Sequence, residues 1–124
     1  MARKQAVTPL KRGDIFVVNF NPTVGSEIKK TRPALVLQND IANKYSSVTI
    51  VAAITSYDKK DRLYPTEVFI QSKEGGIDND SIILLNQIRT VDKGRLIKKL
   101  GAVSAITMAK VEKSLVISLG MMEV

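Results

Sequence analysis

The most constraining feature of this sequence is a series of short runs rich in β-branched and apolar residues, each ended by turn-forming residues. The clearest run, residues 48–55 (VTIVAAIT), is almost continuously apolar and predicts a strand buried on both faces. Four further runs predict strands at residues 13–20, 33–38, 65–71 and 81–91. Glycine, proline and charged residues fill the intervening segments, as is typical of loops and turns.

The end of the chain follows a different pattern, which predicts one closing helix over residues 105–121 with Ser104 as its N-cap. The apolar residues that share one face of this helix are Met108, Val111, Leu115, Leu119 and Met122. Several short strands before a single helix predict a mainly β fold, a small SH3-like antiparallel barrel with a C-terminal helix. Periodicity alone leaves other α+β meanders open. Residues 1–10 are expected to form a flexible tail, and residues 11–124 a single domain.

Composition excludes whole classes of chemistry. The 124 residues contain neither Cys nor His, which removes disulfides, zinc centres of the structural kind and any catalytic mechanism with a Cys nucleophile or a His base. The net charge of +7 is consistent with a highly soluble surface and equally with binding to a polyanion such as nucleic acid. No apolar run has the length of a membrane span, and no secretory signal is visible, so we expect a cytoplasmic protein.

Three places could carry chemistry. Glu27 lies among cations in a loop, where it could act as a base or simply form local ion pairs. Arg32 precedes a proline, which favours an extended backbone and could aim the guanidinium at a phosphate, although an arginine at a strand end often only covers apolar surface. Thr55 closes the buried run, where a hydroxyl could border a site or satisfy backbone groups.

Four segments together resemble the MazF/PemK toxin family: residues 12–27 (RGDIFVVNFNPTVGSE), 32–40 (RPALVLQND), 48–55 and 80–96 (DSIILLNQIRTVDKGRL). The resemblance implies the small barrel fold of the CcdB/MazF/PemK type, a homodimer, and a toxin that cleaves single-stranded mRNA at specific sequences. It further implies attack by the ribose 2′-OH, which leaves a 2′,3′-cyclic or 3′-phosphate and a 5′-OH end. It implies no metal or other cofactor, and control by an antitoxin with a disordered, acidic segment.

The matching motifs also assign individual residues. The resemblance implies that Arg32, Thr55 and Glu27 are catalytic, with Arg32 holding the phosphate, Thr55 donating a hydrogen bond to it and Glu27 accepting the 2′-OH proton. The positions expected to bind RNA are Phe20, Lys29, Lys30, Asn39, Lys59, Lys60, Arg62, Asn86 and Gln87. The segment between Gly25 and Arg32 reads SEIKKT, whereas relatives often carry a glycine pair there.

Two other functions fit the same fold. A toxin of this architecture can poison a protein such as DNA gyrase, since fold alone does not fix function. A catalytically silent barrel that binds nucleic acid would need only the basic loops. The joint presence of Glu27, Arg32 and Thr55 at family spacing favours the ribonuclease.

Overall fold

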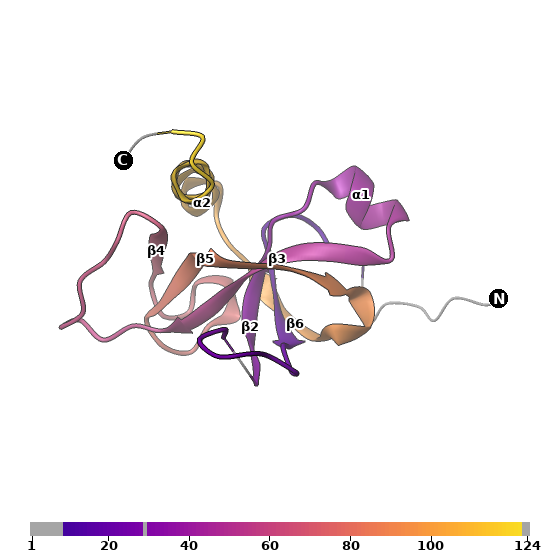
Figure 1. The fold of residues 1–124 in the computed structure, drawn as a ribbon, viewed down its shortest axis with the longest axis horizontal. Coiled ribbons are helices and arrows are strands. Elements are labelled where there is room, and N and C mark those ends of the chain that lie inside the picture. The colour runs from indigo at the N-terminus through magenta and orange to yellow at the C-terminus, as the bar shows by residue number, and fades with distance from the viewer. Residues whose placement is uncertain (1–8, 29, 123–124) are drawn as a thin grey trace.

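The structure is a computed structural model that describes residues 9–28 and 30–122. Six strands form one antiparallel sheet in the order β4-β5-β3-β2-β1-β6, with one helix across a face of it (Figure 1). The strands are β1 (Asp14–Asn19), β2 (Thr31–Val36), β3 (Val48–Ser56), β4 (Glu67–Ile70), β5 (Ser81–Asp92) and β6 (Leu96–Ala102). The helices are α1 (Asp40–Tyr45) and α2 (Ala105–Ser118), with short 3₁₀ turns η1 (Glu74–Gly76) and η2 (Lys93–Arg95).

Two apolar clusters, one on each face of the sheet, follow from the alternation of side chains along the strands. In β1, Ile15 belongs to the cluster beneath α2, whereas Phe16 and Val18 belong to the cluster on the opposite face. Strand β3 contributes to both clusters, as its nearly continuous apolar sequence predicts. Irregular register between β1 and β6 and between β3 and β5 indicates bulges, which bend strands. The predicted barrel-like fold with a C-terminal helix is confirmed, although the sheet stays open between β4 and β6.

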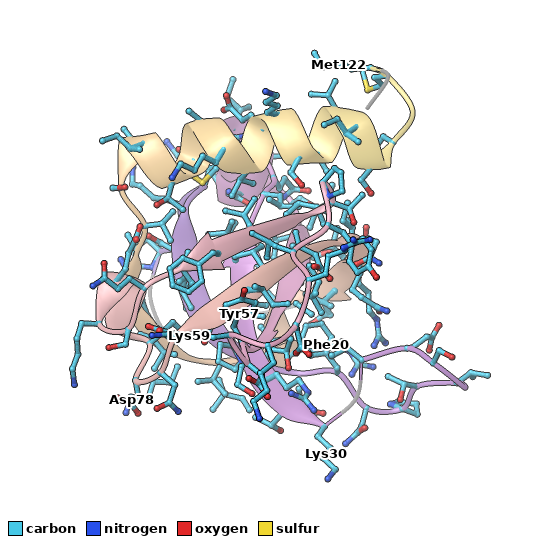
Figure 2. The ribbon with its side chains drawn as sticks, turned by 90° about the vertical axis from the view of Figure 1, so that its left-hand side faces the viewer. Phe20, Lys30, Tyr57, Lys59, Asp78 and Met122 are labelled. Atoms are coloured by element: carbon cyan, nitrogen blue, oxygen red, sulfur yellow. The ribbon has the colours of Figure 1, made fainter. Side chains whose placement is uncertain are left out.

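Helix α2 begins as predicted, because the Ser104 hydroxyl accepts a hydrogen bond from the Thr107 backbone N–H at 3.1 Å. Val111 is fully buried against the sheet, and Figure 2 shows the helix lying across one side of it. The helix ends at Ser118 rather than at residue 121, since Gly120 adopts a left-handed φ of 76°. Leu119 and Met122 are therefore exposed instead of extending the buried face. Within the described residues, no helix is long and apolar enough to span a membrane.

Two elements and one boundary differ from the sequence prediction. Strand β6 and helix α1 were not predicted: β6 is an edge strand with exposed lysines, and α1 has only six residues. Residues 1–8 of the expected tail lie outside the described residues. Leu10, also assigned to the tail, is 7% exposed and packs into the core, so the packed chain begins before residue 11.

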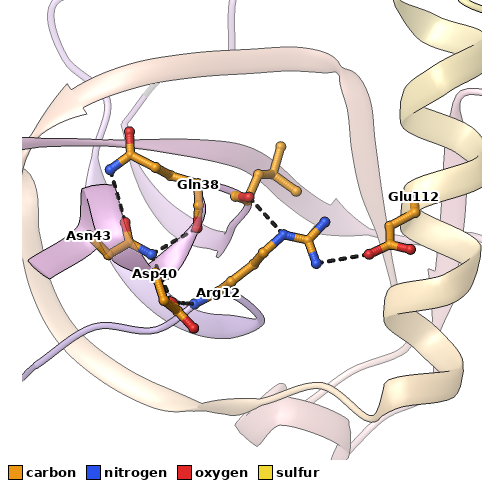
Figure 3. Close-up of polar contacts among 6 residues, drawn as sticks. Arg12, Gln38, Asp40, Asn43 and Glu112 are labelled. Carbon is orange, nitrogen blue, oxygen red and sulfur yellow. Dashed lines mark hydrogen bonds and ion pairs between the residues drawn. The ribbon is translucent and has the colours of Figure 1, made fainter.

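A polar network joins Arg12, just before β1, to α1 and α2 (Figure 3). The Arg12 guanidinium donates to the Leu37 carbonyl at 3.0 Å and pairs with Glu112 of α2 at 2.9 Å. The Arg12 backbone N–H donates to the Asp40 carboxylate at 2.7 Å, and the Asn43 side chain donates to it at 3.2 Å. These donors favour the ionised form, so they hold the pKa of the Asp40 carboxyl below its ordinary value.

This contact predicts a component of acid sensitivity. Because the folded-state pKa of Asp40 is depressed, its stabilising effect is present above the unfolded pKa of about 4 and is lost as pH falls below it. We expect Asp40→Asn to be slightly less stable than the wild type at pH 6 and to lose less stability between pH 6 and pH 3. Thermal unfolding of both proteins across this range measures the difference, and parallel losses would contradict the assignment.

Candidate functional site

Arg32 and Thr55 come together because β2 and β3 are antiparallel neighbours. The register pairs Ala34 with Ala53, so the start of β2 lies beside the end of β3. Arg32 and Ala34 share one face of β2, and Thr55 and Ala53 share the same face of β3. The Arg32 Nη1 donates to Thr55 Oγ1 at 3.5 Å, the outer limit of a hydrogen bond. Both side chains are half-buried, which leaves a cation and a hydroxyl at the border of the core.

The loop between β1 and β2 carries Glu27, the third residue predicted to be catalytic. The Glu27 carboxylate accepts a hydrogen bond from the Val24 backbone N–H at 2.6 Å, and the Glu27 N–H donates to the Val24 carbonyl at 3.1 Å. These contacts fold the tip of the loop into a turn and leave Glu27 exposed. Lys30, near the end of the loop, has a φ of 71°, a conformation that favours glycine. The Lys30 N–H donates to the Asn21 side chain at 3.1 Å.

A cavity of about 160 Å³ lies between this loop and β5. Its lining consists of Phe20, Glu27, Ile28, Gln87, Ile88 and Arg89. Two of these residues, Phe20 and Gln87, are among the predicted RNA contacts, and a third, Glu27, is among the predicted catalytic residues. Phe20 is fully buried, so it forms an apolar wall of the cavity. Gln87 Oε1 accepts a hydrogen bond from the Ile28 backbone N–H at 3.2 Å, which joins the returning half of the loop to β5.

Two arginines that sequence reasoning missed hold the outgoing half of the same loop. Arg89 Nη1 donates to the Phe20 carbonyl at 2.5 Å. Arg95 of η2 donates to the carbonyls of Asn19, at 3.0 Å, and of Asn21. One signal was present in the sequence: Arg89 follows Gln87 by two residues on a predicted strand, so both point to the same face. Together with Gln87 they form what we call the loop clamp: Gln87, Arg89 and Arg95.

The other predicted RNA contacts are more scattered. Lys59, Lys60 and Arg62 are exposed in the loop that follows β3, and Asn86 is exposed on β5. Asn39 lies beyond the far end of β2 from Arg32, where its side chain caps α1 by accepting from the Ala42 N–H at 2.9 Å. Lys29 lies outside the described residues.

Lys30 directly precedes β2, and Lys59, Lys60 and Arg62 follow β3, so these cations lie on the loops next to the strand ends that carry Arg32 and Thr55. In Figure 2, Phe20, Lys30, Tyr57 and Lys59 all lie on the side of the sheet away from α2. Among residues 9–28 and 30–122, no three acidic side chains gather into a group able to hold a metal ion. The Arg32–Thr55 pair offers a fixed cation and a hydroxyl donor, and Glu27 offers a carboxylate on the loop that leads into β2, although the cavity that Glu27 lines does not include Arg32 or Thr55.

Comparison with known proteins identifies the family. Residues 11–119 match the family described as PemK-like, MazF-like toxin of type II toxin–antitoxin system. The chain belongs to this family. It is 47% identical over 114 residues to Endoribonuclease EndoA of Bacillus subtilis, which covers 92% of this chain and 97% of that protein.

Solved MazF structures share the fold. MazF from Deinococcus radiodurans superposes with a TM-score of 0.78 at 29% identity, covering 92% of this chain and 99% of that one. A MazE–MazF complex from the same organism gives a TM-score of 0.72 at 28% identity and covers 93% of this chain and 99% of that one. The predicted membership of the MazF/PemK family is thus confirmed.

The loop clamp predicts how the β1–β2 loop responds to substitution. A hydrogen bond from a charged donor contributes about 1.5–3 kcal/mol, so Arg89→Gln should raise local opening of this loop roughly tenfold to a hundredfold. We expect faster hydrogen exchange at the Phe20 amide, which donates to the Lys30 carbonyl, and faster trypsin cleavage after Lys30. Arg12→Gln is the matched control, because it also removes a guanidinium–carbonyl bond, but far from this loop. Equal loop opening in both variants would contradict the clamp.

Proposed function

We propose that this MazF/PemK-family toxin cleaves single-stranded RNA at the Arg32–Thr55 pair. The toxin is an endoribonuclease, as its family membership and its 47% identity to Endoribonuclease EndoA indicate. The observation that supports the location of the site is the convergence of Arg32 and Thr55, 23 residues apart in sequence, at 3.5 Å. A gyrase poison or a silent binding protein would not need this arrangement.

The reaction proceeds by an internal attack within the RNA. The ribose 2′-oxygen forms a bond to the adjacent phosphorus as its proton passes to the Glu27 carboxylate, directly or through water. The bond from phosphorus to the 5′-oxygen then breaks, and that oxygen takes up a proton. One product ends in a 2′,3′-cyclic phosphate, which can open to a 3′-phosphate, and the other ends in a 5′-OH.

Arg32 and Thr55 act on the phosphate. A guanidinium stays protonated at any working pH and offers paired donors that match two phosphate oxygens. Arg32 therefore holds the phosphate and stabilises the negative charge that builds up on it during attack. As a donor close to the leaving 5′-oxygen, Arg32 is also the candidate general acid. Thr55 adds a neutral hydrogen bond to a phosphate oxygen.

The surrounding residues guide the RNA strand. Lys30, Lys59, Lys60 and Arg62 contact backbone phosphates, which makes affinity fall steeply with salt. Asn86 and Gln87 present amide groups to the edges of unpaired bases. The Gln87 side-chain oxygen accepts from the Ile28 N–H, so its NH2 group is the part that donates to a base edge, and one side chain thus joins the bound RNA to the β1–β2 loop.

The partners follow from the family. A MazE–MazF complex is known from Deinococcus radiodurans, and we infer that an antitoxin with a disordered, acidic segment likewise occupies the basic side of this toxin. The exposed apolar end of α2, with Leu119 and Met121, is suited to a homodimer contact. Because the substrate is mRNA, the toxin acts in the cytoplasm.

The principal test is cleavage of a long mixed-sequence RNA in excess EDTA, with mapping of the new ends. The wild type should make discrete cuts that leave 5′-OH ends. Arg32→Ala should cut about a hundredfold more slowly or worse, because it removes charge stabilisation from the transition state. Arg12→Gln, outside the site, should cut normally. Equal cutting by Arg32→Ala and the wild type would place the active site elsewhere.

The internal attack is tested on the substrate. An RNA with 2′-deoxyribose at the cleaved nucleotide should bind within about twofold of the normal RNA and resist cutting, because it lacks the nucleophile. Fluorescence anisotropy measures binding and gel electrophoresis measures cutting. Cleavage of the deoxy-substituted RNA at the normal rate would disprove attack by the 2′-OH.

A further inference from the structure

Two aromatic side chains lie beside Thr55 and have no place in the reaction described above. The sheet register pairs Thr55 with Ile82 of β5, and Ile82 in turn with Phe69 of β4. Side chains that pair across neighbouring strands point to the same face, so Thr55, Ile82 and Phe69 form one row across the sheet. With strands about 4.8 Å apart, Phe69 is roughly 10 Å from Thr55 along this row.

The second aromatic residue, Tyr57, follows the end of β3 and contacts Phe69. It follows Thr55 by two residues, and its backbone N–H donates to the Asp80 carbonyl at 3.0 Å, which continues the pairing of β3 with the start of β5. The rings of Tyr57 and Phe69 meet edge to face, with centroids 5.4 Å apart and planes at 68°. We call this pair the aromatic platform.

The apolar core does not account for the platform. The neighbours of Phe69 in β4, Val68 and Ile70, are buried beneath α2, whereas Phe69 is 37% exposed on the outer face. Phe16 and Phe20, by contrast, are fully buried. Phe69 and Tyr57 thus form an aromatic surface on the outer face of an edge strand, in the same row as Thr55, where a ligand can reach it.

The surroundings of the platform match an unpaired nucleic acid. The Tyr57 hydroxyl donates to the Asp61 carbonyl at 3.2 Å, which ties the ring to the exposed loop that carries Lys59, Lys60 and Arg62. Aromatic faces beside cations are the usual means of binding single-stranded RNA, in which bases stack on rings while phosphates meet the cations.

We propose that Tyr57 and Phe69 stack one base of the RNA strand next to the nucleotide that is cut, and so help to select the cleavage site. This inference rests on the proposed ribonuclease function. The row through Thr55, Ile82 and Phe69 makes the platform continuous with the Arg32–Thr55 pair, so one short stretch of RNA can touch both. A protein partner on the same face is the competing occupant, and the experiment separates the two.

The test begins from the RNA that the wild type cuts, made uncleavable by 2′-deoxyribose at the cut nucleotide. Phe69→Leu and Tyr57→Leu remove a ring, whereas Phe69→Tyr and Tyr57→Phe keep it. Tyr57→Phe also removes the bond to Asp61, which separates stacking from loop anchoring. Tyr45→Leu is the matched control, because it removes a tyrosine that is 74% exposed on α1, away from β4 in Figure 1.

Loss of a stacked base should raise the Kd of each Leu variant about fivefold to 150-fold, with no such change in the ring-keeping variants or in Tyr45→Leu. An abasic nucleotide at one position beside the cut should weaken binding to the wild type by a similar factor and bring no further loss in Phe69→Leu. 2-Aminopurine at that position should be quenched by the wild type and not by Phe69→Leu.

Three results would overturn the inference. The first is wild-type affinity in both Leu variants, and the second is additive losses from the abasic nucleotide and Phe69→Leu. The third is a Leu variant that changes oligomeric state or antitoxin affinity while RNA affinity stays constant, which would assign the platform to a protein contact. If the wild type binds RNA but does not cut it, the proposed ribonuclease function fails, and the abasic arm, run on any RNA that binds, still tests the stacking.

Discussion

The antiparallel pairing of β2 with β3 is the constraint on which the site depends. It places Arg32 beside Thr55, although 23 residues separate them in the sequence. Next to them the two strands pair through Ala34 and Ala53. A slip of one residue would turn Arg32 to the opposite face of the sheet. Such a slip is prevented because β2 and β3 both contribute buried residues to each of the two apolar clusters. The packing of the core therefore fixes the geometry of the Arg32–Thr55 pair.

The β1–β2 loop is held less tightly than the sheet. Phe20 and Ile28 pack its two ends against the core, whereas Gln87, Arg89 and Arg95 hold its backbone by hydrogen bonds, which can be exchanged for bonds to water or RNA. Lys30 adopts a left-handed conformation, which costs a non-glycine residue roughly 1 kcal/mol. A lysine kept there at that cost is consistent with a role for its charge.

The predictability of each feature depended on how local its cause was. Strand β3 was predictable because a strand buried on both faces has a nearly continuous apolar sequence. The start of α2 at Ser104 was predictable because an N-cap residue is a local signal. Strand β6 was not predictable from its own composition, since an edge strand with Lys98 and Lys99 on its surface resembles a loop. Arg89 was missed because its spacing from Gln87 indicates the shared face but not the Phe20 carbonyl that it binds. Phe69 was missed because only the sheet register shows which residues lie beside it on the neighbouring strands.

The positions of Arg32, Thr55 and Glu27 matter because the chain contains no histidine. Many nucleases rely on a side chain that changes protonation near neutral pH, and this chain has none of that kind, so catalysis must come from where fixed charges and donors lie. A guanidinium and a hydroxyl work only if the phosphate sits at the correct distance from both, and Glu27 works only if its loop brings it to the 2′-OH. In the proposed reaction these tasks are divided between the sheet, which holds Arg32 and Thr55, and the anchored loop, which carries Glu27. In the same proposal, the basic loops and the aromatic platform select which phosphate of an RNA strand lies at the Arg32–Thr55 pair.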